Sequence, residues 1–407
     1  MDLSLDYTNK SLKNTEIIIS GSKSESNRLL ILQKLFPNIT LENVSDSDDT
    51  LHLQHALTSN EETIDIGHAG TAMRFLTAFF ATDPDREVIL TGSSRMQERP
   101  IQILVNALQD LGADIRYVNK EGFPPLKIQG KKIQKEKVTM KGNVSSQYIS
   151  ALLLVAPSLP KGLEIELEGE ITSAPYLQMT VTLLQKLGIR VDWKGPVIKV
   201  FPKKQIDPLE LTVESDWSSA SYFYSLVALS ETGELSLSAY DRESLQGDSR
   251  LTEIYKELGV ETLFYQNGIH LKKIKGFEQR NIKLDLIEQP DIAQTIAVTC
   301  FGLGIACDLT GLHTLKIKET DRLEALKNEL SKLGAEISVT DKSLHIRPSH
   351  EIIPNISIET YNDHRMAMAF APLALKVPLK IMDAEVVSKS YKHFWRDFDS
   401  AFTSISE

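Results

Sequence analysis

The stretch KIKETDRLEAL gathers residue types that can bind anions and transfer protons. Two cations, Lys318 and Arg322, flank two acids, Glu319 and Asp321, and an apolar-periodic run follows at once. Taken alone, the pattern predicts a solvent-exposed helix start with Thr320 or Asp321 as its N-cap. Taken as chemistry, it offers two cations for carboxylate or phosphate groups and an acid for proton transfer. The choice depends on what the fold places nearby.

Other segments that introduce helices also carry cations. Small polar residues precede apolar runs at GSKSESNR, GHAGTAMR, GNVSSQ, DWSSAS and NDHRMAM, and the nearby cations are Lys23, Arg28, Arg74, Arg365 and, in RMQERP, Arg95 and Arg99. Because a helix N-terminus presents unpaired N–H groups and a positive dipole, Gly- and Ser-rich starts suit anions. None of these segments has the P-loop or GxGxxG pattern. Each one alone fits a plain N-cap or a buried arginine paired with an acid, whereas their joint occurrence predicts a local anion site.

These helix starts belong to a repeat. An amphipathic helix ending in Leu-Gly, then a strand, a polar turn and a second strand occurs four times, with glycines suited to the left-handed position at Gly112, Gly188, Gly259 and Gly334. With the helix starts that run alongside, the chain is predicted to hold about six copies of a two-helix, multi-strand unit. The class is α/β with mixed sheets. A chain of 407 residues exceeds the usual size of one core, which predicts two domains of three units each.

Composition excludes several classes of protein. A formal net charge of −10 disfavours a nucleic-acid partner. The N-terminus lacks a signal-peptide pattern and the most apolar segment carries two lysines, so we expect a cytoplasmic protein without a membrane partner. Cys300 and Cys307 lie in an apolar stretch without metal-ligand spacing, so we expect both in the core and neither in a disulfide or zinc site.

The chain resembles the EPSP synthase (3-phosphoshikimate 1-carboxyvinyltransferase) family of enolpyruvyl transferases. The motifs run in order along nearly its whole length: GSKSESNR, AGTAMR, RMQERP, SSQ, SAPY, DWSSASY, QGD, PD, KETDR, NDHRMAM and SK. The resemblance implies a two-domain inside-out α/β barrel of six βαβαββ units, three per domain, whose helix N-termini converge on an interdomain cleft. It implies a lower domain of residues 1–19 and 216–407, which carries KETDR and DHRMAM, and an upper domain of residues 20–215, which carries AGTAMR, RMQERP and SSQ.

The resemblance also implies the reaction and its residues. The enolpyruvyl group of phosphoenolpyruvate passes to the 5-hydroxyl of shikimate 3-phosphate by addition and elimination, in the shikimate pathway to chorismate and the aromatic amino acids. A monomer that closes its domains over the substrates is implied, with no metal or organic cofactor. The implied catalytic residues are Asp291, Glu319 and Lys23. The implied shikimate 3-phosphate ligands are Lys23, Ser24, Arg28, Ser145, Ser146, Gln147, Ser173, Tyr176, Asp291 and Lys318. The implied phosphoenolpyruvate ligands are Lys23, Gly70, Arg99, Gln147, Arg322, Arg365 and Lys389.

Two other functions compete with this interpretation. One is a non-catalytic anion-binding homologue, although Lys23, Asp291, Glu319 and Lys389 are all retained. The other is a UDP-N-acetylglucosamine enolpyruvyl transferase, which characteristically lacks the KETDR block and uses a loop cysteine. The sequence departs from the family pattern at His68, Phe75, Thr314 and Lys392. The first two lie beside the phosphoenolpyruvate loop and leave sensitivity to glyphosate, which competes with phosphoenolpyruvate in this family, an open question.

Overall fold

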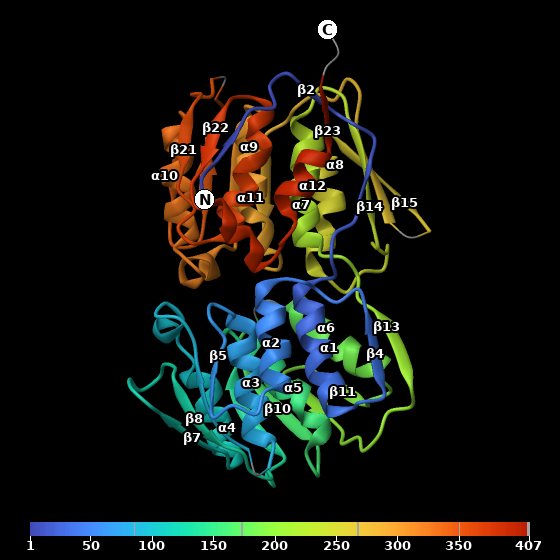
Figure 1. The fold of residues 1–407 in the computed structure, drawn as a ribbon, viewed down its shortest axis with the longest axis vertical. Helices are drawn as coiled ribbons and strands as arrows, with labels where there is room; N and C mark the ends of the chain where they lie inside the picture. The colour runs from blue at the N-terminus through green and yellow to red at the C-terminus, as the bar shows by residue number, and fades with distance from the viewer. Residues whose placement is uncertain (85, 172–173, 267, 350, 405–407) are drawn as a thin grey trace. The chain divides into compact units, whose positions relative to one another are not determined.

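The computed structural model describes residues 1–84, 86–171, 174–266, 268–349 and 351–404, which form two compact units (Figure 1). Unit 1 comprises Met1–Ser20 and Glu214–Glu407, and unit 2 comprises Gly21–Val213. The chain therefore begins in unit 1, builds all of unit 2, and returns to complete unit 1. The boundaries expected from the sequence lie at residues 19/20 and 215/216.

Unit 2 combines helices with mixed sheets. Its helices are α1 (Lys23–Leu35), α2 (Asp48–Thr58), α3 (Gly70–Thr82), α4 (Gln102–Leu111), α5 (Ser146–Val155) and α6 (Ala174–Lys186), with short 3₁₀ turns η1 (Met96–Glu98) and η2 (Ala156–Ser158). Its strands are β4 (Ile39–Glu42), β5 (Thr63–Asp65), β6 (Glu87–Thr91), β7 (Asp114–Tyr117), β8 (Leu126–Gln129), β9 (Lys137–Lys141), β10 (Leu163–Glu168), β11 (Val191–Lys194), β12 (Val197–Val200) and β13 (Leu209–Thr212).

Unit 1 is built from the same kinds of element. Its helices are α7 (Trp217–Leu229), α8 (Leu251–Lys256), α9 (Ala293–Gly302), α10 (Arg322–Lys332), α11 (His364–Phe370) and α12 (Phe394–Ser400). The 3₁₀ turns are η3 (Gly247–Arg250), η4 (Pro290–Ile292), η5 (His313–Ile317), η6 (Ala371–Leu375) and η7 (Ala384–Lys389). The strands are β1 (Leu3–Leu5), β2 (Lys10–Leu12), β3 (Glu16–Ile17), β14 (Glu234–Ser238), β15 (Val260–Tyr265), β16 (Gly268–Lys273), β17 (Ile282–Asp285), β18 (Cys307–Thr310), β19 (Ile337–Val339), β20 (Leu344–Ile346), β21 (Ile356–Ile358), β22 (Leu379–Ile381) and β23 (Phe402–Ser404).

The predicted repeat appears as four sheets with one topology. Their orders are β5-β6-β8-β7, β9-β10-β12-β11, β3-β14-β16-β15 and β17-β18-β20-β19. In each, the first two strands are parallel and the second of them follows a helix, while the last two form an antiparallel hairpin that follows another helix. In three sheets the helix joins the two parallel strands directly, whereas β3 and β14 are separated by the whole of unit 2. This is the βαβαββ unit, and the predicted mixed α/β class is confirmed.

The remaining two copies of the repeat are smaller. One pairs β4 with β13 in parallel around α1 and α2, and the other is the sheet β1-β22-β21 with α11. Both sheets combine segments distant in sequence: β4 and β13 lie near the start and the end of unit 2, and β1 pairs with β22, near the other end of the chain. The expectation of six full βαβαββ copies therefore holds for four sheets, and these two copies are smaller.

Glycine ends the helix in every predicted Leu-Gly copy. Gly112, Gly188, Gly259 and Gly334 all have positive φ, between +69° and +108°. A residue with a Cβ adopts this left-handed conformation only at a cost, so glycine stops each helix and turns the chain into the hairpin. The local sequence alone determines this feature.

Each unit has its own hydrophobic core. In unit 2 the core is centred on α3 and α5, which are buried along nearly their whole length. In unit 1, α7 and α11 are buried along their whole length and α9 along nearly all of it. The core includes Cys300 and Cys307 as free thiols, which confirms their predicted place in the core. Across the described residues, no helix is both long and apolar enough to span a bilayer.

Candidate active site

The start of α1 places Lys23 beside an acid. Ser22 is the N-cap of this helix and accepts a hydrogen bond from the Glu25 N–H. Lys23, the first helical residue, has its Nζ 3.6 Å from Oδ2 of Asp49 in the first turn of α2. Both side chains are largely buried, so the Lys23 ammonium is held in a defined position rather than in bulk solvent.

Arg28 is a buried cation held by neutral acceptors. Its Nε donates to the Thr180 hydroxyl at 2.7 Å, and Nη1 donates to the Ser24 carbonyl at 2.7 Å. Nη2 donates to the Ser150 hydroxyl and the Tyr176 carbonyl, both at 3.3 Å. Burial lowers the pKa of Arg28 to about 10. Arg28 therefore gathers the predicted ligands Ser24 and Tyr176 around one guanidinium.

Phe75, one of the departures from the family pattern, lies against this arginine. The Arg28 guanidinium carbon is 5.4 Å from the centroid of the Phe75 ring, and the ring is fully buried. Such a contact is a cation–π interaction, which favours the charged form of the arginine. Phe75 thus forms one wall of the position that Arg28 occupies.

The start of α3 brings Gly70 and Arg99 together. A Cβ on Gly70 would lie 2.4 Å from Nη1 of Arg99, so a side chain at this position would displace the guanidinium from the helix start. Arg74 ties the two segments by donating to the Gly70 carbonyl at 3.1 Å and the Pro100 carbonyl at 3.0 Å. Arg74, which the sequence analysis counted among the anion-binding cations, therefore braces the loop that carries Arg99.

The start of α5 is connected to α3 by a side-chain hydrogen bond. Gln147 Nε2 donates to the Thr71 hydroxyl at 3.1 Å. Ser145 is the N-cap of α5 without a side-chain cap bond, and Ser146 is buried as its first residue. The predicted ligand Ser173 lies outside the described residues. His68 Nδ1 is 2.9 Å from the Ser93 hydroxyl, which connects the α3 loop to the segment after β6.

In unit 1, the opening stretch KIKETDRLEAL forms the start of α10. Asp321 is the N-cap and accepts from the Leu323 and Glu324 N–H groups, each at 3.2 Å. The capping interpretation is therefore correct, and of the two candidate caps Asp321 is the one used. The helix then begins with Arg322, whose side chain is fully buried.

Arg322 connects three carboxylates. Its Nε donates to Asp363 Oδ2 at 2.7 Å, its Nη1 to Asp291 Oδ1 at 3.1 Å, and its Nη2 to Glu319 Oε2 at 2.8 Å. Burial lowers the pKa of Arg322, but the charges of Asp363, Glu319 and Asp291 outweigh it and raise the pKa above its usual value. One guanidinium thus fixes both predicted catalytic acids relative to the N-cap of α11.

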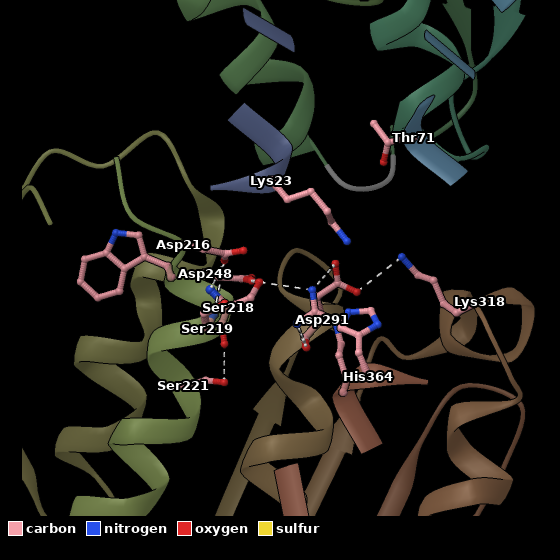
Figure 2. Close-up of polar contacts among 12 residues, drawn as sticks. Lys23, Thr71, Asp216, Ser218, Ser219, Ser221, Asp248, Asp291, Lys318 and His364 are labelled. Carbon is pink, nitrogen blue, oxygen red and sulfur yellow. Dashed lines mark hydrogen bonds and ion pairs between the residues drawn. The ribbon is translucent and has the colours of Figure 1, made fainter. Parts of the chain in front are cut away.

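Three further cations complete this cluster. Asp291 lies 3.5 Å from Lys318 Nζ and 3.4 Å from Arg365 Nη2, and Glu319 accepts from Lys389 Nζ at 2.9 Å. Figure 2 shows Lys318 pointing at Asp291. Burial raises the pKa of Asp291, but Lys318, Arg365 and Arg322 outweigh it and hold the pKa well below its usual range. Asp291 is therefore ionised.

The cluster also includes residues that the sequence analysis did not assign to the site. Ser218, near the start of α7, donates to Asp248 Oδ2 and accepts from Arg365 Nη2 at 3.4 Å. Ser218 and Asp248 lie side by side in Figure 2. Burial, and then the charge of Asp291, raises the pKa of Asp248 to about 7. His364 lies on α11 with Nδ1 3.8 Å from Asp363 Oδ1. The motifs DWSSASY, QGD and NDHRMAM contained these residues, so the signal was in the sequence.

The structure therefore brings together the predicted residues of unit 1 in one ionic cluster: Asp291, Lys318, Glu319, Arg322, Arg365 and Lys389. Among the described residues, no group of three or more His, Cys, Asp or Glu side chains could hold a metal ion. A cluster of cations interleaved with carboxylates, next to serine hydroxyls, suits the binding of polyanionic small molecules and proton transfer on them.

Comparison with solved structures shows that the chain has the enolpyruvyl transferase fold. EPSP synthase from Acinetobacter baumannii superposes with a TM-score of 0.79 at 20% identity, with all of both chains covered. The enolpyruvyl transferase NikO from Streptomyces tendae superposes with a TM-score of 0.75 at 14% identity, with 99% of each chain covered. These likenesses confirm the predicted two-domain fold.

The sequence comparisons identify the family within this class. The family model for EPSP synthase (3-phosphoshikimate 1-carboxyvinyltransferase) matches residues 54–398. A 3-phosphoshikimate 1-carboxyvinyltransferase of Bacteroides fragilis (strain YCH46) is 47% identical over 389 residues, which cover 95% of this chain and 94% of that protein. The chain belongs to the EPSP synthase family. The predicted family, the enzyme class and the enolpyruvyl transfer of the shikimate pathway are thereby confirmed.

Proposed function

We propose that the chain transfers the enolpyruvyl group of phosphoenolpyruvate to the 5-hydroxyl of shikimate 3-phosphate and releases inorganic phosphate. Both substrates carry carboxylate and phosphate groups, so binding them together requires several fixed cations. The observation that carries the proposal is the unit 1 cluster, in which four cations surround two acids, Asp291 and Glu319, without a metal ligand set among the described residues.

The residues that the family resemblance implies are the proposed substrate ligands. The phosphoenolpyruvate ligands are Lys23, Gly70, Arg99, Gln147, Arg322, Arg365 and Lys389. The shikimate 3-phosphate ligands are Lys23, Ser24, Arg28, Ser145, Ser146, Gln147, Ser173, Tyr176, Asp291 and Lys318. The Gly70–Arg99 contact supports the first set, because it places a guanidinium at a helix start. In the second set, the Arg28 bonds to the Ser24 and Tyr176 carbonyls hold these three proposed ligands beside one another.

The addition step requires two proton transfers. Asp291 accepts the proton of the 5-hydroxyl while that oxygen bonds to the central carbon of phosphoenolpyruvate, and Glu319 donates a proton to the methylene carbon, which becomes a methyl group. The low pKa of Asp291 keeps it ionised and available as the base. Lys23 stabilises the developing negative charge and assists proton transfer.

Elimination then regenerates the double bond. Glu319 removes a proton from the methyl group, the bond from carbon to the phosphate oxygen breaks, and phosphate departs with the pair of electrons. Glu319 is a carboxylate only after the addition step, and Arg322 at 2.8 Å and Lys389 at 2.9 Å stabilise that form. Removal of the methyl proton returns Glu319 to the acid form that the next addition needs. The proton that Asp291 took from the hydroxyl leaves with the phosphate, so Asp291 is ionised again.

A phosphate-release assay tests this function directly. The purified protein should release phosphate from phosphoenolpyruvate when shikimate 3-phosphate is present, and should release none when UDP-N-acetylglucosamine replaces it. Phosphate release with the sugar nucleotide would instead support a UDP-N-acetylglucosamine enolpyruvyl transferase. If no phosphate is released with either acceptor, the result would support a non-catalytic homologue. The two cysteines are fully buried, which disfavours the loop-cysteine chemistry of the sugar-nucleotide enzyme.

We further propose that the protein is a cytoplasmic monomer whose domains comprise residues 1–19 with 216–407 and residues 20–215. The mass of the chain is 45.6 kDa, so a monomer should elute and scatter light at that mass. A mass near twice this value in light scattering would show that the monomer assignment is wrong.

A further inference from the structure

Helix α10 contacts the segment that leads into α11 at two points. At its first residue, Arg322 pairs with Asp363 at 2.7 Å, as described above. Two helical turns later, Glu329 lies on the same face of α10, since residues seven apart share a face. The Glu329 side chain has no exposed surface. The second contact point has no part in the catalytic cluster described so far.

Glu329 accepts hydrogen bonds from that segment. Oε1 accepts from the Tyr361 hydroxyl at 2.7 Å, and Oε2 accepts from the Glu359 N–H at 3.1 Å. Lys332, one turn further along α10, donates to Oε2 at 2.7 Å from the exposed side. A buried carboxylate is costly without donors, and two of these three donors, the Tyr361 hydroxyl and the Glu359 N–H, belong to the segment and hold it against α10. Lys332 belongs to α10 and does not contribute to that link.

The backbone that Glu329 holds is in an unusual conformation. Tyr361 and Asn362 are consecutive non-glycine residues that both have φ of +54°. Bulky residues rarely adopt this region, and they stay there only when the surrounding structure determines it. The next residue is Asp363, whose N–H donates to the Thr360 carbonyl at 2.8 Å and whose carboxylate accepts from the Arg365 N–H at 2.9 Å. The left-handed turn therefore aims Asp363 at Arg322 and starts the helix that carries Arg365.

We propose that Glu329 is a positioning residue for the enolpyruvyl transfer. Through the Tyr361 hydroxyl and the Glu359 N–H it holds the left-handed turn at 361–362, and the turn fixes Asp363 and Arg365. This inference rests on the proposed function, in which Arg322 and Arg365 bind phosphoenolpyruvate. Loosening the turn would therefore affect phosphoenolpyruvate more than shikimate 3-phosphate.

The test is a double-mutant cycle on phosphate release. Tyr361→Phe removes one donor and keeps the ring, and it should lower kcat/KM for phosphoenolpyruvate about tenfold, less than the hundredfold that a misplacement of ~1 Å can cost. KM for shikimate 3-phosphate should stay at the wild-type value. Glu329→Gln should have an effect at least as large. Since both changes break the same link, the double variant should be no slower than Glu329→Gln alone.

Lys332→Gln provides the matched control, because it removes the partner of Glu329 on the exposed side and leaves the Tyr361 bond in place. It should keep wild-type kinetics. If Tyr361→Phe lowers the midpoint of thermal unfolding but leaves both kinetic constants unchanged, the contact is only structural and the proposal is wrong. Additive losses in the double variant would overturn it as well. If Glu329→Gln does not fold, Tyr361→Phe alone decides. A wild-type protein that releases no phosphate would refute the proposed function itself.

Discussion

Replacing Glu319 by glutamine should abolish most turnover while leaving the ionic cluster assembled. The Glu319 side chain is 14% exposed and accepts from Arg322 Nη2 at 2.8 Å and from Lys389 Nζ at 2.9 Å. Glutamine has the same length, and its amide oxygen can keep one of these two bonds, whereas its NH₂ group then faces the other cation. The geometry is therefore largely preserved, and what is lost is a group that can donate and accept a proton.

The size of the effect follows from that loss. A positioned general acid–base group contributes a factor of about 10² to 10⁴, so kcat for phosphate release should fall by that factor. This corresponds to about 3 to 5 kcal/mol in activation free energy. The affinity for the substrates should stay the same or rise, because the variant removes a negative charge that competes with the substrates for Lys389 and Arg322.

The assay therefore measures two quantities in parallel. Phosphate release under saturating substrates gives kcat, and titration calorimetry with shikimate 3-phosphate and phosphoenolpyruvate gives binding. Glu324→Gln is a matched control five residues further along the chain, in the first turn of α10, since Glu324 is half exposed and pairs with Lys327 at 3.3 Å. It should behave as the wild type. Normal turnover of Glu319→Gln would refute the assignment of Glu319, and loss of binding in step with turnover would show that the residue is structural.

Three further predictions concern other residues of the site. Asp291→Ala should lower kcat by at least about 10²-fold with an unchanged circular dichroism spectrum, and wild-type kinetics would remove Asp291 from the mechanism. Phe75→Leu should raise KM for shikimate 3-phosphate about threefold to fivefold at unchanged kcat, because it removes the ring face at 5.4 Å from Arg28; an unchanged KM would contradict this role. The pKa of Asp248 is raised to about 7, so the native state favours its protonated form, and the wild type should lose thermal stability relative to Asp248→Asn as the pH rises from about 4 to 7; parallel curves would contradict it.

Local sequence determines the parts of the fold that depend on one or a few neighbouring residues. The four Leu-Gly helix ends could be predicted because glycine is the residue that adopts positive φ readily, and Gly112 has φ of +108°. The N-cap Asp321 could be predicted to within one position for the same kind of reason. Both features need no knowledge of distant segments.

The contacts within the site depend on pairs that the sequence does not specify. Arg322 meets Glu319 three residues away, but it also meets Asp363, which is 41 residues further along the chain. Arg74 shows the same limit in the other direction. Its charge and place at a helix start suggested an anion ligand, yet it donates to two backbone carbonyls and braces the loop of Arg99. Residue type predicts that an arginine binds hydrogen-bond acceptors, but the fold determines whether that acceptor is a substrate anion or a backbone carbonyl.

The cluster in unit 1 divides its cations into fixed and exchangeable ones. Arg322 has 2% of its side chain exposed and donates to three carboxylates, so it keeps both acids in place and has only one N–H, on Nη1, left for a substrate. Lys318 and Lys389 are more exposed, at 28% and 13%, and each pairs with one acid of the cluster. An ammonium on a flexible stem can turn from a carboxylate to a substrate anion, which a planar guanidinium fork does less readily. Under the proposed function, we therefore expect substrate binding at the lysines to release Asp291 and Glu319 from those partners while Arg322 keeps both acids in place, which would couple anion binding to proton transfer.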